Sequence, residues 1–386
     1  MSLMEKIMKV IFIHPAHMDY RVELFEKLNQ NYDTTFVFTK QGRGQDNVNE
    51  KQQEIPKEWK SKVLKTNFKA GRKDIGMYLK LIRELLFSNY DVVLTSTSWY
   101  VCWIIAKIRR KKFVFMTEFW HWEDSSVCRK LLNKFTKLVS KTSDSIFAMG
   151  TNAYTCYRNF GVDKNKIFTH PQCAVDYSKN PTLDLRSKLE LQDKKIILYL
   201  GRVIERKGLG YLLNSLKMLE NDNVNAFLLV AGDGPDRNKY EKMVADLGLN
   251  NVLFVGQIEE KEKASYYNVC DLFVLPSIFY DYSYEPWGLV INEAMAFSKP
   301  VIATNAVGAS LDMIKNEYNG YVVEEKNIEE LYESIKKILS NEELMRVMGK
   351  NSRKNFEEKN NYITFFETLN QSIEYTMKEI TKTRME

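Results

Sequence analysis

The sequence predicts an α/β protein with two doubly wound domains, each built on a parallel sheet. Two observations carry this prediction. Short apolar runs alternate along the chain with stretches of helical spacing, and such nearly continuous apolar strands are typical of parallel sheets covered by helices on both faces. The chain has 386 residues, and a chain of this length normally divides into about two domains.

The first half contains the apolar runs that we expect to be strands of the first sheet. They comprise residues 9–13, 35–38, 92–94, 113–116, 146–148 and 166–168. Helical spacing between them covers residues 22–28, 75–87, 99–108 and 131–139. A polar stretch at 180–188 then breaks the alternation. We therefore place a first domain at 1–182 and a second at 183–361, and we expect a last helix at 362–386 to pack back on the first domain.

The second half repeats the alternation. Its expected strands are residues 196–200, 226–230, 252–255, 272–275 and 301–304. Its expected helices are residues 209–219 and 289–296, followed by three helices that share 328–379. Because ligands of doubly wound sheets bind outside the carboxyl ends of the strands, we expect the two domains to face a central cleft.

The composition limits the class of protein. The five cysteines are scattered and form no Cys-x-x-Cys pair, which fits buried thiols in a reducing compartment. The sequence shows no signal-peptide pattern and no apolar stretch near the ~20 residues that a membrane span needs. We therefore expect a cytoplasmic protein, either soluble or peripheral on the inner face of the plasma membrane.

The charge is uneven along the chain. Residues 1–190 carry 32 Lys+Arg and 20 Asp+Glu, so +12, and residues 191–386 carry 24 and 30, so −6. A basic first half suggests an anionic partner, although solvated lysines explain it equally well. The aromatic helix at 99–108 precedes four cations at 109–112. It could lie on an anionic membrane surface; we favour a core helix with a cationic C-terminus.

A glycine-bounded basic loop runs from Gly201 to Gly208, between an expected strand and an expected helix. A glycine at a strand end lets the backbone approach a ligand closely. Arg202 and Lys207 place two cations at the carboxyl edge of the sheet, where they can hold a diphosphate. Alone, the loop is more often a turn with solvated basic residues than a ligand site.

Two carboxylates, Glu285 and Glu293, stand eight positions apart around the start of the helix at 289–296. The free amides at the start of that helix form an anion site. A diphosphate there would leave Glu285 near a sugar and Glu293 near a ribose. Both carboxylates could then accept hydrogen bonds from the hydroxyl groups. In the bland alternative, both are solvent-facing helix charges. Glu293 fits that alternative poorly because its helix is otherwise apolar.

These blocks together resemble family 4 retaining glycosyltransferases (glycosyl transferases group 1), which have the GT-B fold of two Rossmann-like domains. The matching blocks are Gly201-Arg202 with Lys207-Gly208, Ala231-Gly232-Asp233-Gly234-Pro235, Val255-Gly256, Cys270 to Ser277, Glu285 to Ala296, Pro300 to Thr304, Gly308 and Asn319-Gly320. Fainter matches are Gly161-Val162-Asp163, Lys166-Ile167 and Val175-Asp176. The resemblance covers most of residues 145–325, in the right order.

The resemblance implies a role for each matching residue. Arg202 and Lys207 would neutralise the donor diphosphate and assist its departure. Glu285 would hold sugar hydroxyls near the reacting carbon. The remaining donor-binding positions are Gly201, Gly232, Ile258 beside the base, the backbone of Trp287, Gly288, Leu289 and Val290, and Glu293 at the ribose. Such catalysis stabilises an oxocarbenium-like state and the departing charge.

Several positions depart from the family pattern. The first loop, from His14 to Arg21, lacks the usual paired glycines, so its contact with the phosphates is in doubt. Ser298 and Ala309 stand where glycines are usual, and Cys173-Ala174 replaces Asn-Gly. The family also has a functional histidine after a first-domain strand. Counting from the strand end favours Glu118 for that role, whereas residue type favours His121, which could equally be packed among tryptophans.

We expect no metal and no cofactor besides the donor. The sequence contains no Asp-x-Asp pair, which a cation-dependent sugar transferase of the other main fold would need. His14 and His17 are three positions apart but lack further ligands.

The sequence therefore predicts a retaining, metal-independent hexosyltransferase. It would use a UDP- or GDP-sugar and a saccharide or lipid-linked acceptor in cell-surface glycan synthesis. A peripheral membrane contact through the basic first domain is open, and no nucleic acid is expected. The alternatives are a GT-B nucleotide-sugar epimerase and a non-catalytic sugar-nucleotide-binding protein; a phosphorylase would need a longer chain.

Overall fold

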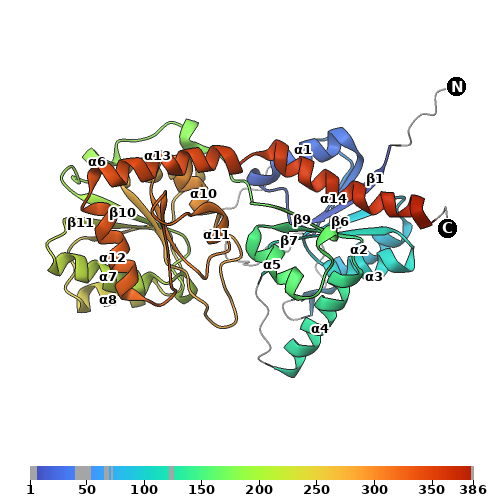
Figure 1. The fold of residues 1–386 in the computed structure, drawn as a ribbon, viewed down its shortest axis with the longest axis horizontal. Coiled ribbons are helices and arrows are strands. Elements are labelled where there is room, and N and C mark those ends of the chain that lie inside the picture. The colour runs from blue at the N-terminus through green and yellow to red at the C-terminus, as the bar shows by residue number, and fades with distance from the viewer. Residues whose placement is uncertain (1–6, 40–53, 65–68, 71–72, 121–125, 384–386) are drawn as a thin grey trace. The chain divides into compact units, whose positions relative to one another are not determined.

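The computed structural model describes residues 7–39, 54–64, 69–70, 73–120 and 126–383. The chain divides into two compact units (Figure 1). The first unit comprises residues 1–170 together with 362–386, and the second comprises 171–361. In the part of the chain that the structure describes, no helix is both long and apolar enough to cross a membrane.

The first unit is built on a parallel sheet with the strand order β3-β2-β1-β6-β7-β8-β9. Its strands are β1 (Lys9–His14), β2 (Asp33–Phe38), β3 (Ser61–Val63), β6 (Val92–Thr95), β7 (Lys112–Thr117), β8 (Ser145–Met149) and β9 (Ile167–His170). Its helices are α1 (Val22–Asn31), α2 (Ile75–Phe87), α3 (Trp99–Ile108), α4 (Val127–Thr142), α5 (Thr151–Asn159) and α14 (Tyr362–Thr383). A short antiparallel pair, β4 (Lys69–Ala70) and β5 (Lys73–Asp74), precedes α2.

Helices cover both faces of this sheet, which is why its strands are apolar throughout. On one face, Ile11 and Ile13 of β1 pack in a core with residues of α2, α3 and α5. On the other face, Phe12 packs against Phe25 of α1. Phe365 of α14 contacts Phe147 of β8 there. The last helix of the chain therefore completes the core of the first unit.

The second unit repeats the plan with the parallel order β12-β11-β10-β13-β14-β15. Its strands are β10 (Lys195–Leu200), β11 (Ala226–Ala231), β12 (Val252–Gly256), β13 (Leu272–Leu275), β14 (Val301–Thr304) and β15 (Gly320–Val323). Its helices are α6 (Leu185–Lys188), α7 (Leu209–Asn221), α8 (Arg237–Asp246), α9 (Lys263–Val269), α10 (Leu289–Ala296), α11 (Ser310–Met313), α12 (Ile328–Leu339) and α13 (Glu342–Lys359).

The predicted α/β class is confirmed, because both sheets are parallel and carry helices on both faces. In the second unit, Leu198 faces a core shared with α9 and α10. Its neighbour Tyr199 faces a core shared with α7 and α12. Strands β3 and β15 were not predicted, because β3 is short and largely exposed and β15 begins with a glycine and is only partly buried, so neither shows a continuous apolar run.

Strand β10 marks the switch point of the second sheet. It lies between β11 and β13, so the strand order reverses direction there. Loops that leave adjacent strands on opposite sides of such a point open a crevice at the carboxyl edge of the sheet. The predicted site residues of the second unit lie in the loops and helix starts that follow these strands.

Candidate functional site

The carboxyl edge of the second sheet is lined by closely packed glycine backbone. The N–H of Gly201 donates to the oxygen of Ala231 at 3.0 Å, and the N–H of Gly232 donates to the oxygen of Gly256 at 2.7 Å. A Cβ on Gly232 would lie 1.8 Å from the oxygen of Gly201. Only glycine fits there, so two strand ends come together without side chains and leave room for a ligand.

The loop after β10 packs closely on the end of β13 because it contains a second glycine, Gly208. Gly208 has a φ of 69°, and a Cβ there would lie 1.8 Å from the oxygen of Pro276. Just before it, Lys207 reaches Glu285, with 2.5 Å between its Nζ and the Oε2 of the carboxylate. The predicted pair Lys207 and Glu285 is therefore in direct contact.

Arg206 is a site residue that sequence analysis did not single out. Its Nη1 lies 2.8 Å from Oε2 of Glu285 and donates to the oxygen of Tyr284 at 2.9 Å. One carboxylate oxygen thus binds two cations. The only signal in the sequence was a third cation in the loop, and its direction toward Glu285 depends on how the loop turns.

Glu285 is a nearly buried carboxylate between two positive charges. Its side chain is 12% exposed. Burial raises the pKa of Glu285, but Lys207 and Arg206 together outweigh burial and hold that pKa below its ordinary value. The group is therefore ionised at neutral pH and can accept hydrogen bonds but not donate a proton.

Arg202 lies apart from this ion-pair cluster. Its side chain is half-buried, and among the described residues no side-chain hydrogen bond or ion pair of its guanidinium is found. Its backbone oxygen accepts from the hydroxyl of Tyr199 at 2.8 Å. The structure thus brings Lys207 and Glu285 together and leaves the guanidinium of Arg202 available to a ligand.

Helix α10 begins beside Glu285 with unsatisfied amides. Gly288 caps it at a φ of 98° without a side-chain cap. A Cβ on Gly288 would lie 3.5 Å from Cγ of Glu285. Within the described chain, the N–H groups of Gly288, Leu289 and Val290 make no backbone hydrogen bond to the preceding loop. These donors and the positive end of the helix dipole can hold an anion beside Glu285.

The side chain of Trp287 has a structural role. It is 2% exposed, and its Nε1 donates to Oδ1 of Asn292 at 3.1 Å. Its backbone oxygen accepts from Ala309 at 2.9 Å. Trp287 therefore fixes the start of α10 through its contacts with Asn292 and Ala309. Only its backbone N–H is available for the predicted anion site.

Glu293 projects from α10 into a second cluster. Its Oε2 accepts from the hydroxyl of Tyr267 at 2.7 Å, and its Oε1 lies 3.4 Å from Nζ of Lys263. Lys263 also pairs with Glu260 at 3.1 Å. Burial lowers the pKa of Lys263, but the carboxylates of Glu293 and Glu260 raise it above its ordinary value overall.

Lys263 and Tyr267 were missed by sequence analysis. They lie four positions apart, which places them on one face of α9. Burial, followed by the charge of Glu293, holds the pKa of Tyr267 well above its ordinary value, so its hydroxyl stays a donor. The pair holds both oxygens of Glu293, and that orientation was not visible in the sequence.

In the first unit, Glu118 directly follows β7 and is half-buried. His121 lies outside the described residues, so the choice between the two remains a prediction. His14 ends β1 and is buried, and its Nδ1 lies 2.7 Å from the oxygen of Ala16. His17 is also buried, against Trp59 and Phe25.

One position that departs from the family pattern has a backbone explanation. Ser298 follows α10 with a φ of 56°, in the left-handed region where glycine is favoured. The usual glycine there is therefore a helix C-terminal residue, not a ligand contact. Gly349 of α13 packs on the same turn, and a Cβ on it would lie 2.2 Å from the oxygen of Ser298.

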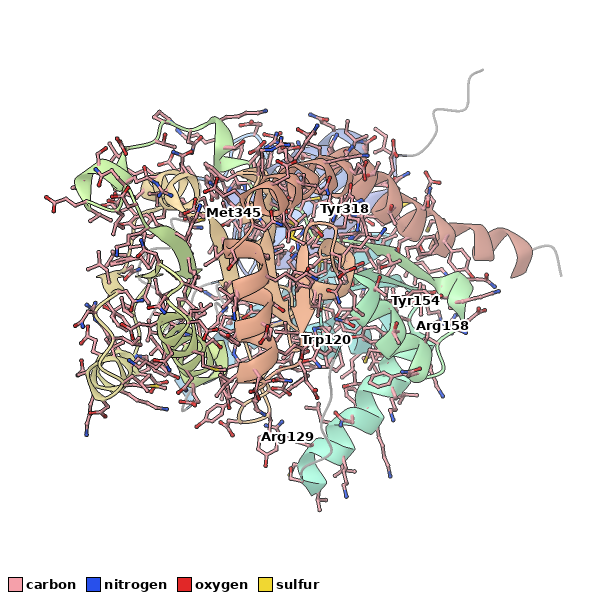
Figure 2. The ribbon with its side chains drawn as sticks, turned by 60° about the vertical axis from the view of Figure 1, so that its left-hand side comes forward. Trp120, Arg129, Tyr154, Arg158, Tyr318 and Met345 are labelled. Carbon is pink, nitrogen blue, oxygen red and sulfur yellow. The ribbon has the colours of Figure 1, made fainter. Side chains whose placement is uncertain are left out.

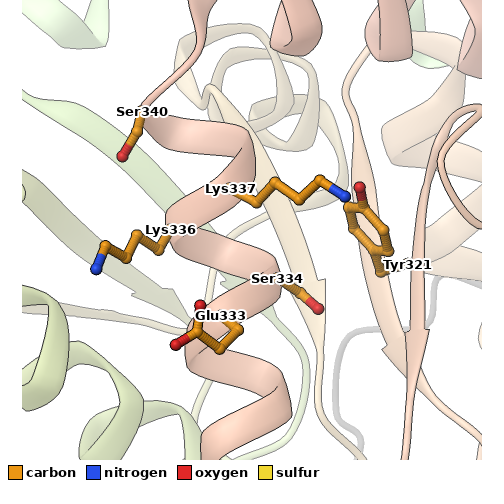
Figure 3. Close-up of a pocket in the computed structure, with 6 residues that line it drawn as sticks. All are labelled: Tyr321, Glu333, Ser334, Lys336, Lys337 and Ser340. Carbon is orange, nitrogen blue, oxygen red and sulfur yellow. The ribbon is translucent and has the colours of Figure 1, made fainter.

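A separate hollow of about 480 Å³ lies on the outside of the second unit (Figure 3). It is lined by α12 and by Tyr321 of β15 and contains none of the predicted residues. Its cations have partners: Lys336 lies 2.6 Å from Asp222, and Lys337 lies 3.1 Å from Glu317. We therefore place the candidate site at the carboxyl edge of the sheet.

The second unit is similar to known proteins. Residues 182–355 match the family model of glycosyl transferases group 1. An uncharacterized glycosyltransferase of Methanocaldococcus jannaschii is 32% identical over 188 residues, which are 48% of this chain and 46% of the relative. The capsular polysaccharide biosynthesis glycosyltransferase CapM of Staphylococcus aureus is 28% identical over 246 residues, 63% of this chain and 58% of the relative. The chain thus spans about half the length of these relatives.

Solved structures share the fold over almost the whole chain. Anabaena HepE in complex with UDP has a TM-score of 0.75 at 17% identity, covering 95% of this chain and 100% of HepE. Sucrose-phosphate synthase of Thermosynechococcus elongatus has a TM-score of 0.73 at 20% identity, covering 96% and 100%. The predicted GT-B architecture of two parallel-sheet units is confirmed at the level of the fold.

Proposed function

We propose, from the match of residues 182–355 to the family model of glycosyl transferases group 1, that this chain is a retaining, metal-independent hexosyltransferase. It would transfer a sugar from a UDP- or GDP-sugar to a saccharide or lipid-linked acceptor in cell-surface glycan synthesis. One observation carries the proposal: Lys207, Glu285 and the open start of α10 meet at one point of the carboxyl edge.

The donor diphosphate would bind at the start of α10. The amides of Gly288, Leu289 and Val290 would donate to its oxygens. Lys207 lies beside them through its contact with Glu285. Arg202, in the same loop as Lys207, supplies a second cation, and a guanidinium can bind phosphate through two hydrogen bonds. These cations would stabilise the departing diphosphate without a metal ion.

Glu285 would act on the sugar. Because it is ionised, it would accept hydrogen bonds from sugar hydroxyls and stabilise the positive charge that develops on the ring. Its lowered pKa argues against a role as general acid. The acceptor's proton would then pass to the leaving phosphate on the same face, which retains the configuration. Retention itself rests on the family resemblance.

Glu293 would accept hydrogen bonds from the vicinal hydroxyl groups of the ribose. Tyr267 and Lys263 hold its oxygens in this structure. Lys263 would give up its weaker, 3.4 Å contact when the ribose binds, while Tyr267 keeps the carboxylate oriented. Ile258, half-buried after β12, would lie near the base.

The relatives support the choice of donor and acceptor class. HepE was crystallised with UDP-glucose as well as with UDP. CapM is named for capsular polysaccharide biosynthesis. On the acceptor side we propose Glu118 or His121 as the functional residue of the first domain.

A thermal-shift screen of UDP- and GDP-sugars tests the proposal. We expect one donor to raise the melting temperature, and Arg202→Ala, Lys207→Ala and Glu293→Ala to abolish that shift. Lys350→Ala is the matched control, because Lys350 is exposed and no ion pair involves it among the described residues. An equal response to every nucleotide, or to none, would count against the proposal. Product analysis that finds a changed free sugar without acceptor would point to an epimerase.

A further inference from the structure

Helix α4 of the first unit turns its apolar side chains outward. Val127 is 75% exposed, Leu131 61% and Leu138 49%. The side chains buried on the other side of the helix are mostly small and polar, namely Asn133, Thr136, Val139 and Ser140. A surface helix of a globular protein normally shows the opposite arrangement.

The inward polar side chains are satisfied where they lie. Thr136 donates to the oxygen of Leu132 at 2.9 Å, and Ser140 donates to the oxygen of Thr136 at 2.7 Å. They therefore require no water, and their small size lets the helix approach the unit closely. One aromatic side chain, Phe135, anchors the helix against Trp99 and Trp103 of α3, at ring distances of 6.2 and 5.7 Å.

The outward face combines an apolar row with a cationic row. Val127, Leu131 and Leu138 follow helical spacing, and so do the lysines beside them, Lys130, Lys134, Lys137 and Lys141. The helix contains no acidic residue. All four lysines are exposed, and among the described residues none of them forms an ion pair. Figure 2 shows this helix extending from its unit, with Arg129 near its first turn.

The segment that sequence analysis considered for membrane contact is used internally. In α3, Trp99, Cys102, Ile105 and Ala106 are buried. Among the cations that follow α3, Arg109 donates to the oxygens of Leu85 and Ser88 at 3.0 and 2.6 Å. Lys112 lies 2.9 Å from Asp144. These two cations secure the unit. Ile104 and Ile108 of α3 stay exposed, but Lys107 beside them pairs with Asp144 at 3.6 Å. The lysines of α4 form no such ion pair among the described residues, which distinguishes its surface.

We propose that the outward face of α4 binds the surface of an anionic phospholipid bilayer. Leucine and valine would enter the boundary between headgroups and acyl chains, and the neighbouring lysines would contact lipid phosphates. Charge complementarity selects this occupant, because an unpaired cationic row beside an apolar row matches a surface that is negative outside and apolar beneath. The proposal does not depend on the proposed transferase activity.

Co-sedimentation of the full chain with vesicles tests the proposal. We expect binding to vesicles that contain phosphatidylglycerol and little binding to phosphatidylcholine alone. Replacing Lys130, Lys134, Lys137 and Lys141 by Gln should lower the partition coefficient by about three orders of magnitude. Replacing Val127, Leu131 and Leu138 by Ser should also lower it. The matched control replaces the exposed lysines Lys164, Lys242, Lys350 and Lys354 by Gln, which leaves α4 intact.

Each outcome decides the proposal. Loss of binding in both α4 variants, with the control variant unchanged, supports it. No binding of the wild type to anionic vesicles, or equal binding by the α4 variants, overturns it. A wild type that is dimeric without vesicles and α4 variants that are monomeric would assign the face to a second copy. Circular dichroism and the donor-induced thermal shift should be unchanged in all variants; if the Ser variant misfolds, the lysine variant alone decides.

Discussion

Glu285 shows how single side chains set the chemistry of the candidate site. Isolation from water alone would favour its neutral form. Two cations from one loop reverse that preference, and both contact the same carboxylate oxygen. The balance is local, so removing one cation should move the pKa of the carboxyl group while leaving the fold in place.

Arg206→Met is expected to move the acid limb of the pH–rate profile of sugar transfer to higher pH. Arg206 lowers the pKa of Glu285, and methionine keeps much of the stem but not the charge. The pKa of Glu285 should therefore rise, and the ionised form should be lost at a higher pH than in the wild type. Measurement of kcat/KM against pH tests this, with Arg346→Met as control because Arg346 pairs with Glu343 on the surface. An unmoved acid limb would remove Arg206 from the site.

At the scale of elements, the start of α10 is positioned by packing at its other end. The helix ends at Ala296, and the turn after it brings the carbonyl oxygen of Ser298 to 2.2 Å from where a Cβ on Gly349 of α13 would lie. The close approach of α13 therefore requires glycine, and it fixes the end of the helix that begins beside Glu285.

Gly349→Ala is expected to destabilise the second unit by roughly 1–3 kcal/mol, the usual cost of overpacking a rigid contact. The added methyl group would meet backbone at 2.2 Å, and backbone cannot rotate away as a side chain can. Urea unfolding measures the effect, and the donor-induced thermal shift should weaken because α10 moves. Lys350→Ala, one position along the same helix, should leave both unchanged; equal stability of the two variants would contradict the packing argument.

At the scale of the whole molecule, mild acid should destabilise the first unit through a buried histidine. His14 is buried at the end of β1, and its ring packs on Phe12 and Phe25. Burial, the charge of Arg21 and neighbouring His17 lower its pKa from 6.5 to about 3, against a smaller raising effect of the hydrogen bond to Ala16. A folded first unit therefore keeps this ring neutral in mild acid.

We expect the free energy of unfolding to fall by about 1.4 kcal/mol per pH unit below the unfolded pKa of His14. Between pH 6.5 and about 3 the unfolded state binds a proton that the folded state excludes. Urea unfolding followed by tryptophan fluorescence reports mainly on this unit, because every tryptophan except Trp287 is in it. His14→Asn, which can keep the hydrogen bond, should show a flatter pH dependence. Parallel pH dependence of the two proteins would show that another group controls acid stability.

The sequence by itself indicated most of the elements and the resemblance to a family. Apolar runs and helical spacing are local patterns, so α2, α3 and α10 were predicted with the bounds that the structure shows. The sequence also indicated the two blocks around Gly201 and Glu285 as parts of a site, because the roles of glycine, lysine and carboxylate there depend on short spacings. The match of residues 182–355 to a family model confirms that resemblance.

Only the tertiary structure decided which distant side chains meet. Arg206 and Glu285 are 79 positions apart, and Lys263 and Glu293 are 30 apart, so no local period relates them. The same holds for α4, because spacing shows that a helix has two faces and not which one is covered. Which face is covered depends on the contacts between elements, and those contacts exist only in the folded chain.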